Sequence, residues 1–87
     1  MKKITLTLTS KLGLHARPAA AFVQTAAAFQ SQVTIGTETK KADAKSILGV
    51  LGLGVRQGTT VTIKVQGPDE DEAAAALQAF FDSEDRD

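Results

Sequence analysis

Apolar and polar residues alternate along two segments of the chain, and this alternation is typical of a strand with one buried face. The first segment is Ile4–Thr9, where isoleucine and leucine alternate with threonine. The second is Thr60–Gln66, where valine and isoleucine alternate with polar residues. We expect both segments to be strands, and we predict shorter strands over Gln32–Ile35 and, more weakly patterned, over Lys40–Ala42.

A helix is predicted from about Ala16 to Ala28, because apolar residues recur there at spacings of three and four positions. These positions are Ala19, Phe22, Val23, Ala26 and Phe29. A short second helix is predicted after Ser46, a residue type that commonly caps helix N-termini, although three glycines follow and weaken it. This second helix therefore depends on packing against the rest of the fold.

A final helix is predicted after the Gly67-Pro68 break, with Asp69 as its N-cap and Glu72 completing a capping box. The apolar residues of its core stripe are Leu77, Phe80 and Phe81. The elements then follow in the order β-α-β-β-α-β-α. Four short half-buried strands and three helices predict a two-layer α+β fold, with the helices on one face of an antiparallel sheet.

The composition excludes several classes of protein. The 87 residues predict a single domain, residues 1–87, in which 83–87 form a frayed tail. Because the chain has no cysteine and one histidine, we expect no disulfide, no metal site and no cofactor. The alternating N-terminal segment is unlike a targeting peptide, and no apolar stretch approaches a membrane span, so a cytoplasmic protein without membrane insertion is predicted.

Positive and negative charges are unevenly distributed, although the net charge is zero. Residues 1–64 carry nine lysines and arginines against two acids, whereas the remainder carries eight acids against Arg86 alone. Local potential of this kind steers charged partners. The chain has no tryptophan or tyrosine and no basic stripe interleaved with aromatics, which argues against direct nucleic-acid binding.

The segment Ser10–Ala20, SKLGLHARPAA, holds the only histidine of the chain, His15. Pro18 has no N–H group and is tolerated only in the first turn of a helix, so the helix starts close to His15. The free N–H groups of Ala16 and Arg17 then lie at the helix N-terminus, where anions are favoured. The guanidinium of Arg17 adds a permanent charge whose geometry suits phosphate, and Gly13 permits a tight turn before the histidine.

The same positive potential disfavours imidazolium, so we expect the pKa of His15 to lie below the ordinary value of about 6.5. A neutral imidazole is a nucleophile, and a phosphoryl group attached to it would be stabilised by the helix N–H groups and Arg17. The residues alone leave two interpretations open. His15 belongs either to an anion or phosphate site or to an ordinary helix start.

GLHARPAA, residues 13–20, resembles the active-site signature of HPr, the histidine-containing phosphocarrier family of the bacterial phosphoenolpyruvate:sugar phosphotransferase system. KSILGVLGLGVRQGTTVTI, residues 45–63, resembles the second signature of that family, around its regulatory serine. The spacing between the two segments fits without gaps, so the resemblance covers nearly the whole chain. It implies an open-faced sandwich whose strands have the order 1-4-2-3.

The resemblance further implies that His15 accepts a phosphoryl group on Nδ1 from phosphorylated Enzyme I and donates it to a sugar-specific IIA protein or domain. Arg17 and the backbone N–H of Ala16 would stabilise the phosphoryl oxygens. Such a protein is a carrier rather than a turnover enzyme. The alternatives are a paralogous carrier of a nitrogen-related or regulatory chain and, more distantly, a module that only binds an anion. Leu12 departs from the serine or asparagine common in the family, which removes a polar group beside the imidazole.

Ser46 has two interpretations. It is an N-cap, or, by the resemblance, also the target of a serine kinase/phosphorylase, whose product a catabolite-control transcriptional regulator would bind. Among the apolar residues that follow it, Ile47 and Val50 are predicted to belong to the core. The residues predicted to form a partner-docking surface are Ala20, Gln24, Leu48 and Leu51.

Overall fold

Four strands pair in the order β1-β4-β2-β3 to form one antiparallel sheet, the order that the resemblance implied. The structure is a computed structural model that describes residues 1–8, 16–56 and 58–84, apart from the side chains of 16–18, 83 and 84. The strands are β1 (Lys2–Thr7), β2 (Gln32–Gly36), β3 (Lys41–Asp43) and β4 (Thr60–Gln66). The bounds of β4 are those predicted, and the other strands differ by one or two residues at their ends.

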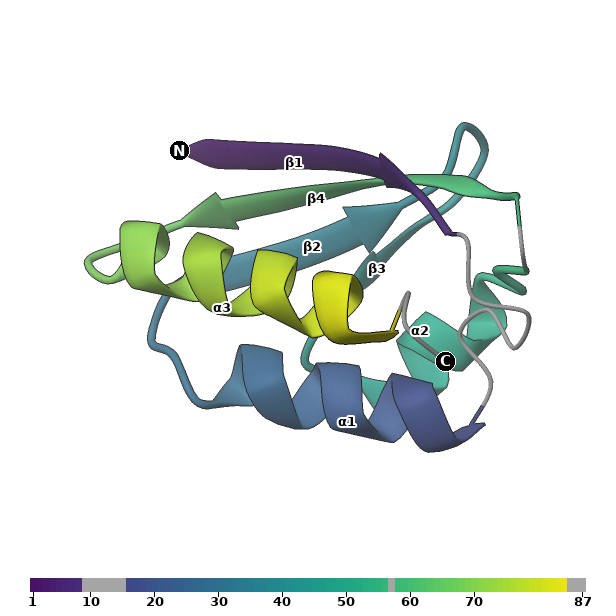
Figure 1. The fold of residues 1–87 in the computed structure, drawn as a ribbon, viewed down its shortest axis with the longest axis horizontal. Helices are drawn as coiled ribbons and strands as arrows, with labels where there is room; N and C mark the ends of the chain where they lie inside the picture. The colour runs from purple at the N-terminus through teal and green to yellow at the C-terminus, as the bar shows by residue number, and fades with distance from the viewer. Residues whose placement is uncertain (9–15, 57, 85–87) are drawn as a thin grey trace.

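Three helices cover one face of this sheet, which confirms the predicted two-layer α+β fold (Figure 1). They are α1 (Ala16–Ala27), α2 (Ile47–Gly52) and α3 (Glu70–Glu84). Helix α3 continues to Glu84, so it includes the first two residues of the segment 83–87 for which we predict a frayed tail. Residues 85–87 lie outside the described residues.

The hydrophobic core lies between the sheet and the helices. The inward residues of β2 and β4 are buried. Of the apolar stripes predicted for the first and last helices, most residues are buried, and Val23, Phe29 and Phe80 are partly buried against the core. The largest of the fully buried side chains are Phe22, Ile35, Ile63 and Leu77. Among the described residues, none of the helices combines the length and apolar character that a bilayer crossing requires.

The start of α3 is stabilised by contacts other than the capping box predicted for Asp69 and Glu72. Asp69 does stand at the N-cap position, since its carbonyl accepts a hydrogen bond from the Ala73 amide at 2.9 Å. Its carboxylate, however, accepts hydrogen bonds from the backbone N–H groups of Gln30 and Ser31, each at 2.9 Å, and from the Ser31 hydroxyl. The capping-box prediction was wrong because this carboxylate is used to hold a loop 38 residues away.

Glu70, rather than Glu72, makes the side-chain contact back to the chain before the helix. Its carboxylate accepts a hydrogen bond from the Gly67 amide at 3.3 Å. Gly67 also lies against the fully buried Ser31: a Cβ added at Gly67 would come within 2.6 Å of the Ser31 Cα. No side chain fits there without moving backbone. The turn before α3 and the loop after α1 therefore pack backbone to backbone at this end of the molecule.

Asp69→Asn should destabilise the protein at neutral pH and much less in acid. Hydrogen bonds from the Ser31 hydroxyl and then the Gln30 amide hold the pKa of the Asp69 carboxyl below its ordinary value. Because the folded-state pKa is the lower one, the stabilisation is present above the unfolded pKa of about 3.9 and is lost as pH falls through the folded pKa. Urea unfolding of both proteins at a series of pH values measures this difference.

Asp71→Asn is the matched control, because it removes the same charge from the same helical turn. The only interaction lost with it is a solvent-exposed ion pair with Lys2, at 3.1 Å. We expect little change in its unfolding midpoint. Equal losses in the two variants, or a difference for Asp69→Asn that persists in strong acid, would contradict the role given to this carboxylate.

Candidate functional site

The N-terminus of α1 is the part of the SKLGLHARPAA segment that the structure describes. The helix begins at Ala16, so Pro18 is its third residue and lies in the first turn. The N–H groups of Ala16 and Arg17 belong to the first turn, where no helical carbonyl precedes them to accept a hydrogen bond. Leu12, Gly13 and His15 lie outside the described residues, as do the side chains of residues 16–18.

The position of α1 is determined by the aromatic residues of its buried face. Phe22 is fully buried and packs against two residues of α3, with ring centroids 5.8 Å from Phe80 and 5.6 Å from Phe81. Ala19 and Ala26, one turn on either side of Phe22, are also fully buried. Core packing from Ala19 to Ala26 therefore fixes the position of α1, and with it the position of the helix N-terminus.

The other end of α1 is held by Lys45, a contact that the sequence pattern does not reveal. The Lys45 ammonium donates a hydrogen bond to the Phe29 carbonyl, just beyond the C-terminus of α1, at 2.8 Å. A cation at this end of a helix is favoured by the helix dipole. Lys45 immediately precedes Ser46, so this contact joins the start of α2 to the end of α1.

Ser46 is the N-cap of α2, as predicted. Its hydroxyl accepts a hydrogen bond from the Gly49 amide at 3.2 Å, and its backbone is extended, as an N-cap residue requires. Figure 1 shows α2 alongside the N-terminal half of α1. Ser46 and the predicted histidine site therefore belong to neighbouring elements.

The apolar residues of α2 divide between two faces. Val50 is fully buried, as predicted, but Ile47 is exposed, so its assignment to the core was wrong. Leu48 is 80% exposed, and Ile47 and Leu51 are each 37% exposed. Ile47 is three residues from Val50 and four from Leu51, so helical spacing alone does not decide which of the two faces it shares.

Of the other predicted docking residues, Gln24 on α1 is exposed and Ala20 is half-buried. A shallow hollow of about 440 Å³ also borders Ser46, and its lining includes Leu48 and the basic residues Lys40 and Lys41. The surface of α2 therefore combines exposed aliphatic side chains with nearby positive charge. Within the described residues, no group of three histidine or acidic side chains could hold a metal ion.

Ser46→Ala should lower the free energy of unfolding by about 1 kcal/mol, because it leaves the Gly49 amide without its side-chain acceptor. Ser46→Asp should largely retain stability, since aspartate is an equally good N-cap. Chemical denaturation of the three proteins measures this order. If both variants lost equal stability, the capping hydrogen bond would not be the cause.

Comparison with known proteins assigns the chain to a family. The protein-family model described as "PTS HPr component phosphorylation site" matches residues 2–83 of the sequence. The chain belongs to the HPr phosphocarrier family. Proteins of this family carry a phosphoryl group in the phosphotransferase system and are not turnover catalysts.

Phosphocarrier protein HPr of Xylella fastidiosa (strain Temecula1) is 46% identical over 78 residues, which cover 90% of this chain and 88% of that protein. The HPr-like protein Crh of Bacillus subtilis is 50% identical over 74 residues, covering 85% of this chain and 87% of Crh. A crystal structure of HPr from Thermoanaerobacter tengcongensis superimposes with a TM-score of 0.94 at 47% identity, covering 100% of this chain and 98% of that one. The fold and the order of elements are thus those of HPr, and the family implies partners from the phosphotransferase system.

Proposed function

We propose that the chain accepts a phosphoryl group on His15 from phosphorylated Enzyme I and passes it to IIA proteins or domains. The observation that carries this proposal is the GLHARPAA segment at the start of α1 in a chain of the HPr family. The Crh relative, whose solution structure is described as that of the catabolite repression HPr of Bacillus subtilis, raises the alternative of a regulatory protein. This chain retains the histidine, and a regulatory protein that takes up no phosphoryl group has no need of it.

The chemistry is the transfer of one phosphoryl group to a nitrogen nucleophile. The lone pair of His15 Nδ1 attacks phosphorus, the new N–P bond forms, and the bond between phosphorus and its carrier atom on Enzyme I breaks. A neutral imidazole is required for this attack, and the positive end of α1 favours the neutral form. After transfer, the N–H groups of Ala16 and Arg17 and the Arg17 guanidinium stabilise the phosphoryl oxygens. Alignment and charge stabilisation provide most of the catalysis in such transfers, so a small protein suffices.

One experiment separates a carrier from a regulatory or binding-only protein. The chain is incubated with Enzyme I and phosphoenolpyruvate carrying a labelled phosphoryl group. A carrier takes up label that is labile in acid and stable in base, as phosphohistidine is, and loses it when a IIA protein is added. Absence of label, with the same Enzyme I active on another carrier, would refute the proposal. Transfer to a nitrogen-related partner but not to sugar-specific IIA proteins would favour the paralogous carrier.

The docking surface proposed for these partners combines α2 with the adjoining face of α1. We call it the α2 patch, and it consists of Ala20, Gln24, Ile47, Leu48 and Leu51. Its most exposed aliphatic residue is Leu48, a large side chain that makes little contribution to the core. Apolar side chains left exposed beside a reactive group are commonly buried by a partner during transfer.

Leu48→Ser should slow phosphoryl uptake from Enzyme I about five- to tenfold at subsaturating carrier concentration, through a higher KM, because a contact worth about 1 kcal/mol is lost. Stability should change little, since Leu48 is 80% exposed. Ala79→Ser, at an exposed position on α3, is the matched control and should leave the kinetics unchanged. Initial rates over a range of carrier concentrations measure both. An unchanged KM for Leu48→Ser would exclude this residue from the docking surface.

Ser46 is proposed as a second, regulatory phosphorylation site for an ATP-dependent serine kinase/phosphorylase, with a catabolite-control transcriptional regulator recognising the product. A phosphate there would add about two negative charges beside the α2 patch and weaken docking by like-charge repulsion with an acidic partner. The lysines that line the hollow at Ser46 provide positive charge near such a phosphate. Acid-stable label from ATP and the kinase, lost in Ser46→Ala, is the expected result. Without such label, Ser46 serves only as a cap.

A further inference from the structure

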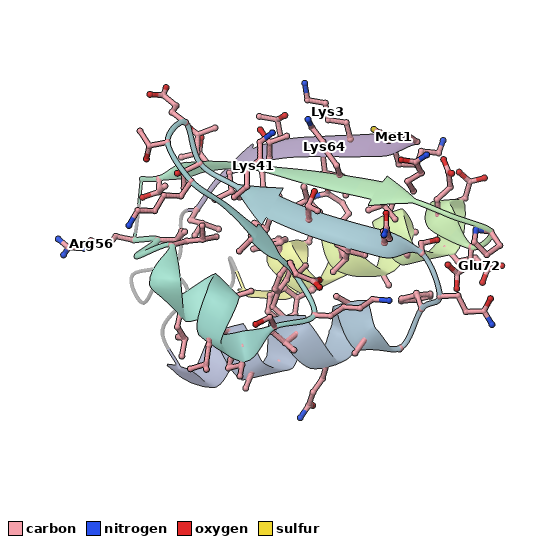
Figure 2. The ribbon with its side chains drawn as sticks, turned by 180° about the vertical axis from the view of Figure 1, so that it is seen from behind. Met1, Lys3, Lys41, Arg56, Lys64 and Glu72 are labelled. Atoms are coloured by element: carbon pink, nitrogen blue, oxygen red, sulfur yellow. The ribbon has the colours of Figure 1, made fainter. Side chains whose placement is uncertain are left out.

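The face of the sheet opposite the helices carries a concentration of positive charge that the phosphorylation site does not use. Three lysines, Lys3 of β1, Lys64 of β4 and Lys41 of β3, belong to this open face. Figure 2 shows the three side chains extending away from the helices. Within the described part of the chain, none of their ammonium groups forms an ion pair with a carboxylate.

Cations at the end of the molecule where α3 begins are instead paired with carboxylates. The Met1 ammonium pairs with Glu70 at 2.8 Å, and Lys2, the neighbour of Lys3 on the same strand, pairs with Asp71 at 3.1 Å. The acids that follow residue 64 therefore compensate positive charge near α3. The three lysines of the open face receive no such compensation from the described residues.

The three lysines line one hollow of about 340 Å³. We call it the lysine groove and define it by its charged and hydroxyl-bearing residues, which are Lys3, Thr34, Thr37, Lys41, Thr62 and Lys64. Its volume falls in the range of about 300–1,000 Å³ that is typical of small-molecule sites. Ammonium and hydroxyl groups both donate hydrogen bonds to anionic oxygens, so the lining chemistry favours an anion.

Gly36 contributes to the shape of the groove. It lies in the sheet row between Thr62 of β4 and Lys41 of β3, and it adds no side chain of its own to the open face. A Cβ at this position would come within 3.2 Å of the Lys41 Cγ and 2.9 Å of the Lys40 carbonyl oxygen. The stem of Lys41 thus lies close over Gly36, where a larger residue would push it away.

The strand register brings like charges together at the groove. Lys3 and Lys64 are directly opposite one another in the β1–β4 pairing. Side chains at such positions have their Cβ atoms about 5 Å apart, and like charges there destabilise a sheet. An anion bound between the two ammonium groups would relieve this repulsion, which gives the occupied groove an electrostatic advantage over the empty one.

We propose that the lysine groove binds a small, multiply charged phosphate compound, at a site separate from the start of α1. Three ammonium groups around one hollow suit a ligand with several negative charges better than a single phosphate. Three exposed charge contacts of the usual strength predict a Kd on the order of 10 mM at low salt for a ligand of purely ionic contacts. Screening weakens this affinity as salt is added.

The test uses tripolyphosphate as the probe and the full chain labelled with nitrogen-15 for NMR titration. Saturable shifts should centre on the amides of the lysine groove. The double variant Lys3→Gln/Lys64→Gln should bind about tenfold more weakly, through the loss of two exposed charge contacts. The matched control is Lys2→Gln/Arg56→Gln, which removes the same charge from outside the groove and should retain the wild-type affinity within about twofold. Thermal melting provides a second readout, because the probe should raise the melting temperature of the wild type and of the control more than that of the groove variant.

Equal weakening in the two double variants would mean general attraction to positive surface charge and would overturn the proposal. Shifts confined to residues 13–17 would place the anion at the start of α1 and would overturn it too, as would shifts that never saturate. The outcome is independent of the phosphocarrier proposal. The groove variant should take up phosphoryl groups from Enzyme I at the wild-type rate whether or not the probe binds the sheet.

Discussion

His15→Ala should abolish the acid-labile phosphoryl label that the wild-type chain is expected to take from phosphorylated Enzyme I. The chain contains no other histidine, so no second imidazole can replace the lost nucleophile. The N–H groups at the start of α1 would remain, but they can only stabilise a phosphoryl group and cannot form a bond to it. The measurement is the label retained after a brief alkaline wash, which should fall to the background of a reaction without the chain.

Two controls make this result specific. The Ser46→Ala chain should retain the label, because Ser46 lies on α2 and is not the proposed nucleophile. The His15→Ala chain should melt at a temperature near that of the wild type, since α1 is anchored from Ala19 onward by buried side chains. Full acid-labile, base-stable labelling of the alanine variant would refute the assignment of His15. Base-labile labelling would instead indicate an acyl phosphate on an aspartate or glutamate.

Phe22→Ala should reduce the free energy of unfolding by about 3–5 kcal/mol, which is a large part of the 5–15 kcal/mol typical of a domain. The side chain is fully buried and contacts both Phe80 and Phe81. Alanine would leave a cavity between α1 and α3, because two rigid rings cannot close a space of that size. Urea unfolding followed by far-ultraviolet circular dichroism measures the loss.

Leu48→Ala is the control for this prediction, since it removes a large aliphatic side chain that is 80% exposed and should change stability by no more than about 0.5 kcal/mol. A loss below about 1 kcal/mol for Phe22→Ala would mean that the helices close over the gap. Because α1 carries the proposed site at its N-terminus, the same variant should also slow phosphoryl uptake at temperatures where it remains folded.

The fold could be predicted from the sequence wherever a local pattern reports burial directly. In β4, strict alternation gave the observed bounds because Val61, Ile63 and Val65 are all fully buried while their neighbours face the open side. The capping box at Asp69 failed for the opposite reason. A rule based on residues three apart cannot anticipate that a carboxylate will be used by Ser31, far away in the chain.

The candidate site shows a similar division. The helix start could be predicted because Pro18 is tolerated only in the first turn, and α1 does begin at Ala16. The anion role of His15 and Arg17 stays a prediction. Two features of α2 could not be predicted in this way, namely the exposure of Ile47 and the contact of Lys45 with the Phe29 carbonyl. Both depend on how α2 packs beside α1, and the spacing of residues in the sequence does not encode that packing. The lysine groove depends in the same way on the register of β1 with β4.

The strand order has a consequence for how the protein is made. The two strands that flank β4, β1 and β2, are complete long before β4 in the sequence, yet they do not pair with each other. In a nascent chain on the ribosome, the edges of β1 and β2 that will face β4 are therefore unpaired until Gln66 has left the exit tunnel. Such edges are prone to pair with other chains. The period in which the chain is prone to such pairing thus ends when β4 emerges from the ribosome. A pause in translation before β4 would prolong this period, because β1 and β2 would still lack the strand that lies between them.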